Sequence, residues 1–336
     1  MKREELKALR VVVIAGGWSE EREVSFSSAR QVCTALAEAG FAHVDLLDLV
    51  DKDLVTRLAS GSYDVALPVL HGRYGEDGCV QGLLEVLHLP YAFSGVAASA
   101  VGTEKELTKA VYAAHGIRAP RGVEVPAGSQ LTSEQIEALV IDLGLPLFVK
   151  PAANGSSYGV SRVTEATQLN DAILAAGTGV GVILIEECIQ GTEISVPVIG
   201  NEDAEALPII EIVTGGDFYD VSVKYEPSAL HHVIPARLAP EVYALAQERA
   251  VAAHKALGCR GCSRSDFIVT DAGEPIILET NTIPGMTAES LLPDSARHAG
   301  IEFPELCTRF VEWAMEGVAD VRSSRPVVQN STEKSS

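Results

Sequence analysis

Residues 264–281 read Arg-Ser-Asp-Phe-Ile-Val-Thr-Asp-Ala-Gly-Glu-Pro-Ile-Ile-Leu-Glu-Thr-Asn. Two runs rich in β-branched and apolar residues flank a turn at Asp271 to Glu274. This pattern predicts a β-hairpin, because turn residues at this spacing reverse the chain between two strands. The C-terminal third of the chain is therefore expected to contain antiparallel sheet.

The register of the hairpin decides which side chains meet. An even loop centred on Ala272-Gly273 places Asp266 opposite Glu279 and Arg264 opposite Asn281. Side chains alternate along a strand with period two, so these four polar residues are expected to share one face. The opposite face is predicted to carry Ile276, Leu278 and Thr280.

Three oxygen donors on the polar face, from Asp266, Glu279 and Asn281, predict a metal site. Mg²⁺ prefers oxygen ligands, keeps several waters and usually shares its shell with substrate phosphates. Arg264 beside these donors would then meet the anion. The simpler alternative for the hairpin alone is a solvent-exposed face with a cross-strand ion pair.

The composition is that of a globular protein with a formal charge of -20. The 336 residues leave room for two or three domains and a large core. The excess of 46 acidic over 26 basic residues argues against nucleic acid and anionic membrane as partners. We find no apolar signal region at the N-terminus and no uninterrupted apolar span of membrane length, so we expect a cytoplasmic protein.

Six cysteines are too few and too scattered for a disulfide framework. Four are expected to be reduced core residues, namely Cys33, Cys79, Cys188 and Cys307. Cys259 and Cys262 have redox or zinc spacing, but no second pair or nearby histidine pair completes a four-ligand site. A functional role for this pair is the less favoured interpretation.

The chain divides into three predicted domains and a tail. Residues 1–102 are expected to form a parallel sheet covered by helices, with strands at 11–15, 43–49 and 65–70 and a helix at 24–39. Residues 103–190 predict a small α+β domain, with strands near Val123 and at 145–150, 161–163 and 182–186 and a helix at 133–143. Residues 191–318 hold the hairpin and helices at 240–257 and 303–316, and residues 319–336 form a disordered tail.

A lysine is predicted in the first turn of a helix at Thr103-Glu104-Lys105-Glu106. The four residues have the form of a capping box, with Thr103 as N-cap and Glu106 at the third helical position. Lysine there works against the helix dipole, although many surface lysines occupy such positions at small cost. A nearby anion would give Lys105 a reason to be there.

A second lysine precedes a loop rich in glycine and serine. Lys150 ends a predicted strand, and residues 151–159 follow as Pro-Ala-Ala-Asn-Gly-Ser-Ser-Tyr-Gly. Small residues let successive N–H groups form an anion-binding nest, although a simple hairpin loop is the alternative. The sequence has no P-loop motif, and Gly16-Gly17 after the first strand lacks the third glycine of a dinucleotide fingerprint.

Two further segments carry polar groups at strand ends. The strand 183–189 contains Glu186 and Glu187, which are suited to an adenine amine and ribose hydroxyls but alone indicate only an exposed strand end. His71 begins a glycine-rich turn, 71–78, at the carboxyl end of a strand, where α/β sheets place ligands. A lone histidine in this position is as often structural as catalytic.

Together these motifs resemble those of the D-alanine:D-alanine ligases, which belong to the ATP-grasp superfamily. The resemblance covers about residues 11–316 and rests on four segments, 16–25, 71–78, 150–159 and 279–287. It implies a fold of the α/β and α+β classes, with an N-terminal Rossmann-like parallel-sheet domain and two ATP-grasp domains. The nucleotide would lie between the antiparallel sheets of those two domains.

The resemblance also implies the ligands of ATP and of two Mg²⁺ ions, for which Mn²⁺ can substitute. Residues matching the nucleotide-binding positions are Lys105, Lys150, Ser157, Glu186, Glu187, Ile189, Glu193 and Tyr219. The metal positions match Asp266, Glu279 and Asn281, the same three residues that the hairpin register brings together.

In the resembled reaction the carboxylate of a first D-alanine is phosphorylated, and the amine of a second D-alanine attacks the acyl phosphate. Residues matching the catalytic positions are Glu21, His71, Ser156, Lys224, Tyr225 and Arg264. Glu21 and His71 also match first-substrate positions, whereas Gly285 and Ser290 match those for the second carboxylate. Tyr225, in a mobile loop within 218–236, implies an amine acceptor, since relatives that use D-lactate differ in this loop.

Three positions depart from the family pattern, namely Trp18, Glu104 and Ser265. Trp18 adjoins the loop of Glu21 and bears on the size of the first-substrate pocket. The resemblance implies a bacterial homodimer that supplies dipeptide for peptidoglycan. Two alternatives stay open: an ATP-grasp ligase with another amino-acid or hydroxy-acid acceptor, and a nucleotide-binding regulatory protein without turnover.

Overall fold

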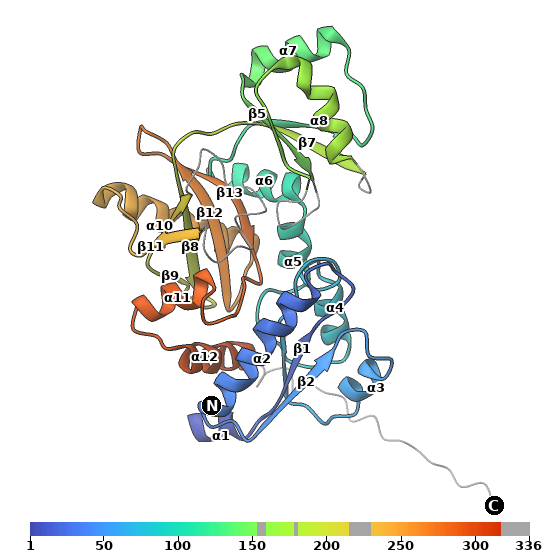
Figure 1. The fold of residues 1–336 in the computed structure, drawn as a ribbon. Coiled ribbons are helices and arrows are strands. Elements are labelled where there is room, and N and C mark those ends of the chain that lie inside the picture. Colours follow the sequence, from blue (N-terminus) through green and yellow to red (C-terminus); the bar gives the residue numbers. More distant parts are fainter. Residues whose placement is uncertain (153–158, 178–180, 215–229, 317–336) are drawn as a thin grey trace, which may run out of the picture.

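The computed structural model describes residues 1–152, 159–177, 181–214 and 230–316 (Figure 1). The predicted disordered tail, 319–336, lies outside these residues. No helix in the described ranges is long and apolar enough to cross a membrane.

The N-terminal part is a parallel sheet in the order β2-β1-β3. Its strands are β1 (Arg10–Ala15), β2 (His43–Asp48) and β3 (Val65–Pro68). Residues 11–15 of the central strand are at most 1% exposed, because helices and loops cover both faces of the sheet. The helices of this part are α1 (Arg3–Lys7), α2 (Arg22–Glu38), α3 (Leu54–Ala59), α4 (Cys79–Val86) and α5 (Val96–Thr103).

The central part is a smaller antiparallel sheet in the order β4-β7-β5-β6. Its strands are β4 (Gly122–Pro126), β5 (Leu147–Pro151), β6 (Ser161–Val163) and β7 (Val182–Glu187). Helices α7 (Ser133–Leu143) and α8 (Leu169–Ala176), with the short 3₁₀ helix η1 (Ala166–Gln168), pack on the sheet at the top of Figure 1. Helix α6 (Lys105–Ala114) lies between this sheet and the next one.

The C-terminal part is a larger antiparallel sheet in the order β11-β10-β8-β12-β13, with β9 paired to β8. Its strands are β8 (Thr192–Ile199), β9 (Glu205–Ala206), β10 (Ile210–Thr214), β11 (Leu230–Val233), β12 (Cys262–Val269) and β13 (Pro275–Asn281). Helices α10 (Pro240–Leu257), α11 (Leu291–His298) and α12 (Phe303–Met315) follow or flank these strands. The predicted fold class, one parallel and two antiparallel sheets, is confirmed.

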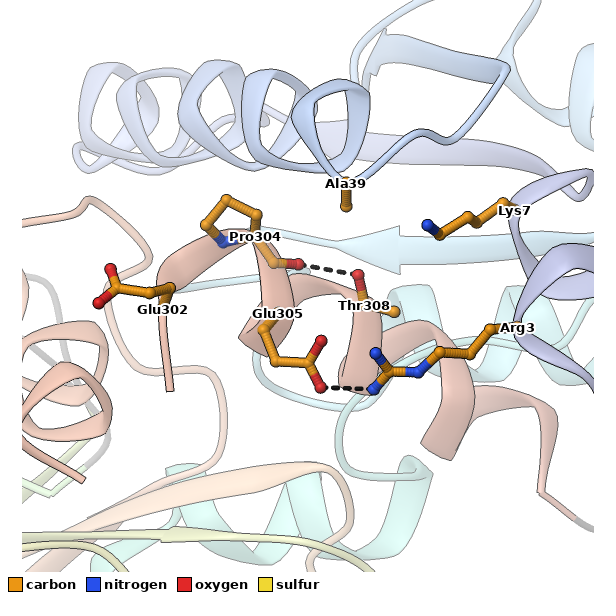
Figure 2. A pocket seen from close by; sticks show the side chains of 7 residues that line it. All are labelled: Arg3, Lys7, Ala39, Glu302, Pro304, Glu305 and Thr308. Carbon is orange, nitrogen blue, oxygen red and sulfur yellow. Dashed lines mark hydrogen bonds and ion pairs between the residues drawn. The ribbon is translucent and has the colours of Figure 1, made fainter. Parts of the chain in front are cut away.

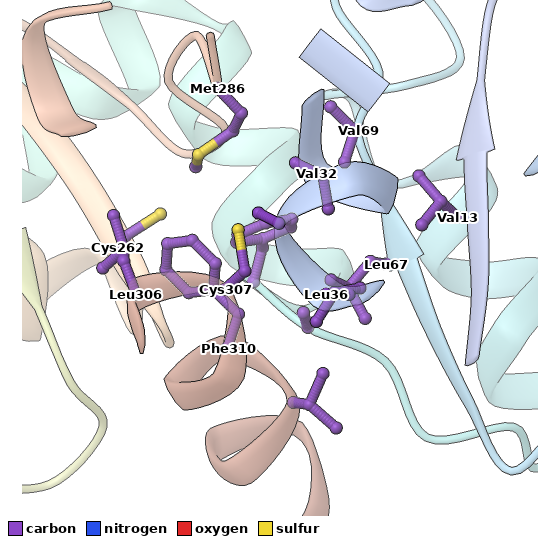
Figure 3. Packing of buried hydrophobic residues seen from close by; sticks show 14 of the residues in the cluster. Val13, Val32, Leu36, Leu67, Val69, Cys262, Met286, Leu306, Cys307 and Phe310 are labelled. Atoms are coloured by element: carbon purple, nitrogen blue, oxygen red, sulfur yellow. The ribbon is translucent and has the colours of Figure 1, made fainter. Parts of the chain in front are cut away.

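One hydrophobic core joins the first and last parts of the chain. Phe310 and Cys307 of α12 pack against Val32 and Leu36 of α2, and the sheet residue Val13 belongs to the same cluster (Figure 3). The small sheet has a separate core beneath α7 and α8. The N-terminal sheet and α12 are therefore held as one body by buried apolar surface.

The capping box predicted at Thr103 is wrong. Thr103 ends α5, and its hydroxyl donates to the carbonyl oxygens of Ser99 at 3.1 Å and Glu76 at 3.0 Å. Glu104 is the N-cap of α6 without a side-chain capping bond. Lys105 nevertheless occupies the first turn of α6, as predicted.

The cysteines are all free, but one of them is not a core residue. Cys79 is exposed because Val80 and Leu84 take the buried face of α4. Cys33 and Cys188 are half-buried, and Cys307 is buried as predicted. Burial raises the pKa of Cys259 to about 11 and that of Cys262 well above its ordinary value, which favours their thiol forms over metal-binding thiolates.

The hairpin has the predicted register at the end that carries Arg264 and Asp266, but the turn differs from the predicted one. Asp266 pairs with Glu279 and Arg264 with Asn281. The turn is odd rather than even, since the N–H of Thr270 donates to the carbonyl of Glu274 at 3.0 Å.

A β-bulge between the two ends of the hairpin restores the register, because Asp266 faces Glu279 whereas Phe267 faces Ile277. Leu278 is the additional residue. The predicted apolar face is therefore partly wrong: Ile277, not Ile276, joins Phe267 in a core cluster. Thr280 lies on the predicted face, opposite Ser265; it is buried, and its hydroxyl lies 2.7 Å from that of Ser265.

A buried histidine in this core predicts acid sensitivity. His254 is fully buried on α10, and its Nδ1 lies 2.8 Å from Ser263 Oγ. Burial lowers the pKa of His254 to about 4, whereas an unfolded histidine titrates near 6.5. The unfolded chain therefore takes up the proton first, and the free energy of unfolding is expected to fall by about 3 kcal/mol between pH 6.5 and pH 4.

Denaturant unfolding of His254→Gln across this pH range measures the effect. The variant is expected to lose most of the slope, whereas His43→Gln, at an exposed position on β2, should keep it. Equal slopes in His254→Gln and the parent protein would contradict this origin of the acid sensitivity.

Candidate active site

The polar face of the hairpin contains a tightly paired arginine and carboxylate. Arg264 Nε donates to Asp266 Oδ1 at 3.0 Å, and its Nη2 donates to Oδ2 at 2.8 Å. Ser195 on the neighbouring strand β8 donates to the same Oδ1 at 2.5 Å. Ser195 has no counterpart among the sequence predictions, because only the β8–β12 register brings it opposite Asp266. A bidentate pair of this kind holds both groups in fixed orientation.

Helix α6 contacts the hairpin through two side chains. Lys105 Nζ lies 3.3 Å from Glu279 Oε2, which confirms an anionic neighbour for this first-turn lysine. About two turns further along α6, on the same face, the hydroxyl of buried Tyr112 donates to Thr280 Oγ1 at 2.6 Å. Asn281, at the end of the same strand, uses Oδ1 to accept the N–H of Ile283 at 2.9 Å. Strand β13 and α6 are thereby fixed relative to each other.

The same helix contacts the small sheet through a lysine that the sequence analysis did not single out. Lys109 Nζ lies 3.0 Å from Glu186 Oε1 on β7 and 2.9 Å from Glu106 Oε1. Lys150, on the adjacent strand β5, pairs with the other oxygen of Glu186. The signal available in the sequence was spacing, since Lys105 and Lys109 are four residues apart and share a helix face.

The N-terminal part contributes a buried histidine beside two carboxylates. His71 Nδ1 lies 4.0 Å from Glu76 Oε1, and the carbonyl of His71 accepts a bond from Ser19 Oγ at 2.8 Å. Burial acts to lower the pKa of His71, but Glu76 and Glu21 outweigh it and the pKa is raised overall, although the charge of Arg264 opposes them. The two carboxylates therefore favour the protonated form of the imidazole.

Two further features of this corner concern His71 Nε2 and the backbone at Gly72. His71 Nε2 is buried and has no hydrogen-bond partner among the described residues. Gly72 has φ +71°, and a Cβ placed on it would lie 3.2 Å from Glu21 Oε2. Buried polar groups in native structures usually have partners, so an orphan at a site edge indicates a position completed by a ligand.

Ser290 and Gly285 meet at the N-terminus of α11. Ser290 is the N-cap of α11, and its Oγ accepts the N–H of Thr287 at 3.1 Å. A Cβ on Gly285 would lie only 2.8 Å from that oxygen, so glycine is required for this close approach. Backbone N–H groups at a helix N-terminus favour anions such as carboxylates.

The other described residues predicted to bind the nucleotide, Glu187, Glu193 and Ile189, lie in different environments. Glu187 follows Glu186 on β7, so its side chain lies on the opposite face of the strand. Its Oε1 accepts the backbone N–H of Arg121 at 2.9 Å. Glu193 is on β8, two residues before Ser195, and alternation places it on the polar face. Ile189 lies between β7 and β8 and is half-buried.

Five predicted site residues lie outside the described ranges, namely Ser156, Ser157, Tyr219, Lys224 and Tyr225. Trp18, flagged for its size, is 66% exposed and packs edge-on against Tyr74 with ring centroids 5.7 Å apart. Its bulk therefore points to solvent beside the loop of Glu21. This leaves the group formed by Glu21, His71 and Gly72 intact.

A surface depression elsewhere is unrelated to this site. It lies between α1, α2 and α12 (Figure 2). Its lining includes the ion pair between Arg3 and Glu305 at 2.5 Å and none of the residues above. Within the described ranges no three histidine, cysteine or carboxylate side chains form a metal cluster, so a metal at the hairpin would rest on two carboxylates and an amide oxygen.

Two family models match the chain. The one described as "D-ala D-ala ligase C-terminus" matches residues 113–312, and the one described as "D-ala D-ala ligase N-terminus" matches residues 49–94. A relative named D-alanine–D-alanine ligase from Pelotomaculum thermopropionicum is 43% identical over 92% of this chain and 97% of its own length. Another of that name, from Anaeromyxobacter sp. (strain Fw109-5), is 44% identical over 91% and 96%.

Solved structures agree with the sequence comparison. A D-alanine–D-alanine ligase from Bacillus anthracis complexed with ATP superposes with a TM-score of 0.80 at 31% identity, covering 94% of this chain and all of the other. The D-alanine-D-alanine ligase from Coxiella burnetii gives a TM-score of 0.79 at 28% identity, with coverage of 94% and 97%.

Proposed function

Because this chain belongs to the D-alanine–D-alanine ligase family, we propose that one site binds ATP and two molecules of D-alanine. It is formed by the groups described above on the hairpin, at Glu186, around His71 and at the N-terminus of α11. The chain is an ATP-dependent ligase that forms D-alanyl-D-alanine, a precursor of peptidoglycan. The observation that carries the site assignment is the position of α6. Lys105 pairs with Glu279 of the large sheet, and Lys109 pairs with Glu186 of the small sheet.

ATP lies between the two antiparallel sheets in this proposal. Lys105 and Lys150 bind the phosphates, and each is already paired with a carboxylate, so their charges are held in place before the nucleotide arrives. Glu186 accepts the adenine amine, and Glu193 faces the ribose from β8. Ser157, Tyr219, Ile189 and Glu187 complete the proposed nucleotide set.

The donor set on the hairpin fits Mg²⁺. Asp266 and Glu279 offer carboxylate oxygens and Asn281 an amide oxygen, and the cations Arg264 and Lys105 now balance the two carboxylates. When bound, two Mg²⁺ ions, or Mn²⁺ in their place, would neutralise charge on the transferring phosphoryl group.

The first D-alanine is bound in the N-terminal corner. Glu21 accepts a hydrogen bond from its ammonium, and His71, whose Nε2 has no partner among the described residues, donates to its carboxylate. That carboxylate is then phosphorylated to an acyl phosphate. Ser156, Lys224 and Tyr225 are proposed to close over the intermediate and exclude water.

The second D-alanine meets the acyl phosphate from the opposite side. Ser290 and the backbone at Gly285 hold its carboxylate at the N-terminus of α11. Arg264, fixed by two bonds to Asp266, stabilises the oxyanion that forms when the amine attacks. Phosphate then leaves from the tetrahedral intermediate.

The reaction and the relatives also support proposals for the cellular location, the oligomeric state and the domains of the enzyme. We propose a cytoplasmic bacterial enzyme, since the reaction consumes ATP, and a homodimer. Three domains, 1–102, 103–190 and 191–318, are proposed to supply the first D-alanine corner, the small sheet and the metal site.

The reaction is tested by product identification. ADP and phosphate release is measured with ATP, Mg²⁺ and D-alanine, beside L-alanine, D-serine and D-lactate as competing substrates. Mass spectrometry is expected to identify D-alanyl-D-alanine as the main product. A preference for D-lactate would reject the amine acceptor, and ATP binding without ADP release would reject the ligase reaction.

Gly72→Ala is expected to raise the KM for D-alanine about tenfold or more, because the new Cβ crowds Glu21 and Ser19. Steady-state kinetics at saturating ATP measure the change. Gly61→Ala is the matched control, since its φ of +74° imposes similar strain with nothing within 4 Å. Equal KM values in the two variants would show that backbone strain, not Glu21, is responsible.

A further inference from the structure

The buried carboxylate of Glu186 is held by two lysines through different oxygens. Glu186 is 4% exposed on β7. Lys109 on α6 approaches Oε1 at 3.0 Å, and Lys150 on β5 pairs with Oε2. A buried carboxylate is costly unless a charged partner satisfies it, and one lysine already supplies the opposite charge. The second one requires a separate explanation.

The two lysines differ in what else they are expected to bind. Under the proposed function, on which this inference rests, Lys150 turns to the phosphates when ATP enters. Lys109 is also held by Glu106 at 2.9 Å, and its side chain is 13% exposed. It therefore remains on Oε1 while Oε2 loses its partner. The vacated oxygen is an acceptor with fixed orientation.

We propose that Lys109 is a positioning residue that holds Glu186 in place to accept the exocyclic amine of adenine once Lys150 has moved to the phosphates. The arrangement selects a base with an amino donor at that position. Guanine carries a carbonyl oxygen there, and two acceptors facing each other in a buried site repel. Lys109 thus sets the choice of nucleotide without contacting it.

The test compares ATP with purine riboside triphosphate, which has hydrogen in place of the amine. Dissociation constants are measured by calorimetry without D-alanine, so the test does not depend on turnover. The parent protein is expected to bind ATP about tenfold more tightly than the analogue, the effect of one hydrogen bond to a charged group. In Lys109→Met this ratio is expected to fall to about one, with the KM for D-alanine unchanged.

Control variants separate positioning from general stabilisation. Glu106→Gln removes the charge of the other partner of Lys109 but keeps an oxygen that can accept from it, and should keep at least half of the parent ratio. Lys109→Arg retains a cation but changes the donor geometry, and a ratio at least threefold below the parent is expected. Thermal denaturation shows whether Lys109→Met is folded; if it is not, Lys109→Arg decides.

A parent-like ratio in the folded Lys109 variants, or equal weakening of both nucleotides in them, would overturn the proposal. Failure of the parent protein to form D-alanyl-D-alanine would instead refute the proposed reaction.

Discussion

Glu279→Gln is expected to reduce kcat roughly 10²–10³-fold and to raise the Mg²⁺ concentration needed for half-maximal rate. The substitution removes a negative charge that now balances Lys105 at 3.3 Å, while keeping the size of the side chain. A weaker donor leaves the charge of the transferring phosphoryl group less well neutralised. Initial rates across a Mg²⁺ titration at saturating ATP and D-alanine measure both effects.

The control for this variant lies on the same hairpin. Glu274→Gln changes the same residue type at the turn, where Glu274 pairs with Arg118 and Arg249 far from the predicted metal donors. It should leave the rate and the Mg²⁺ requirement at parent values. If Glu279→Gln also left both unchanged, Glu279 would not be a metal ligand.

Arg264→Met is expected to lower kcat roughly 10²–10³-fold, with the KM for ATP changed by no more than a few-fold. Arg264 is proposed to act on the oxyanion, which exists only along the reaction path, so its loss should affect turnover more than nucleotide binding. Steady-state kinetics with both substrates varied separate the two parameters.

Arg237→Met is the matched control for Arg264. Arg237 makes the same kind of bidentate pair, with Glu211 on β10 of the same sheet, but its side chain is 65% exposed. Parent-like kinetics are expected. Retention of more than a tenth of the parent kcat in Arg264→Met would remove Arg264 from the proposed mechanism.

Much of this architecture follows from local sequence signals. Helices at 133–143 and 240–257 have the bounds predicted from periodicity and end signals, because apolar spacing and caps act within a few residues. These helix bounds depend on interactions between neighbours in the chain. The pairing of Asp266 with Glu279 was predicted from an even turn, whereas it arises from an odd turn and a compensating bulge.

What escaped prediction depends on residues distant in sequence. Lys109 contacts Glu186 only because the fold places β7 beside α6. Ser195 reaches Asp266 only because β8 lies beside β12. Thr103 fits a capping pattern in the sequence, but its hydroxyl donates instead to the carbonyls of Ser99 on α5 and of Glu76. Tertiary contacts thus override a local motif when they satisfy the same donor.

The odd turn and the bulge of the hairpin constrain how this protein can evolve. Exposed turns usually accept insertions and deletions freely. Here a one-residue deletion between Asp271 and Gly273, if Glu274 joined the turn to keep three residues in it, would shift β13 by one position and send Glu279 to the face of Phe267. The change becomes harmless only if the bulge at Leu278 disappears in the same lineage. Turn length and bulge are expected to be inherited together, although one is on the surface and the other beside the carboxylates proposed to bind the metal.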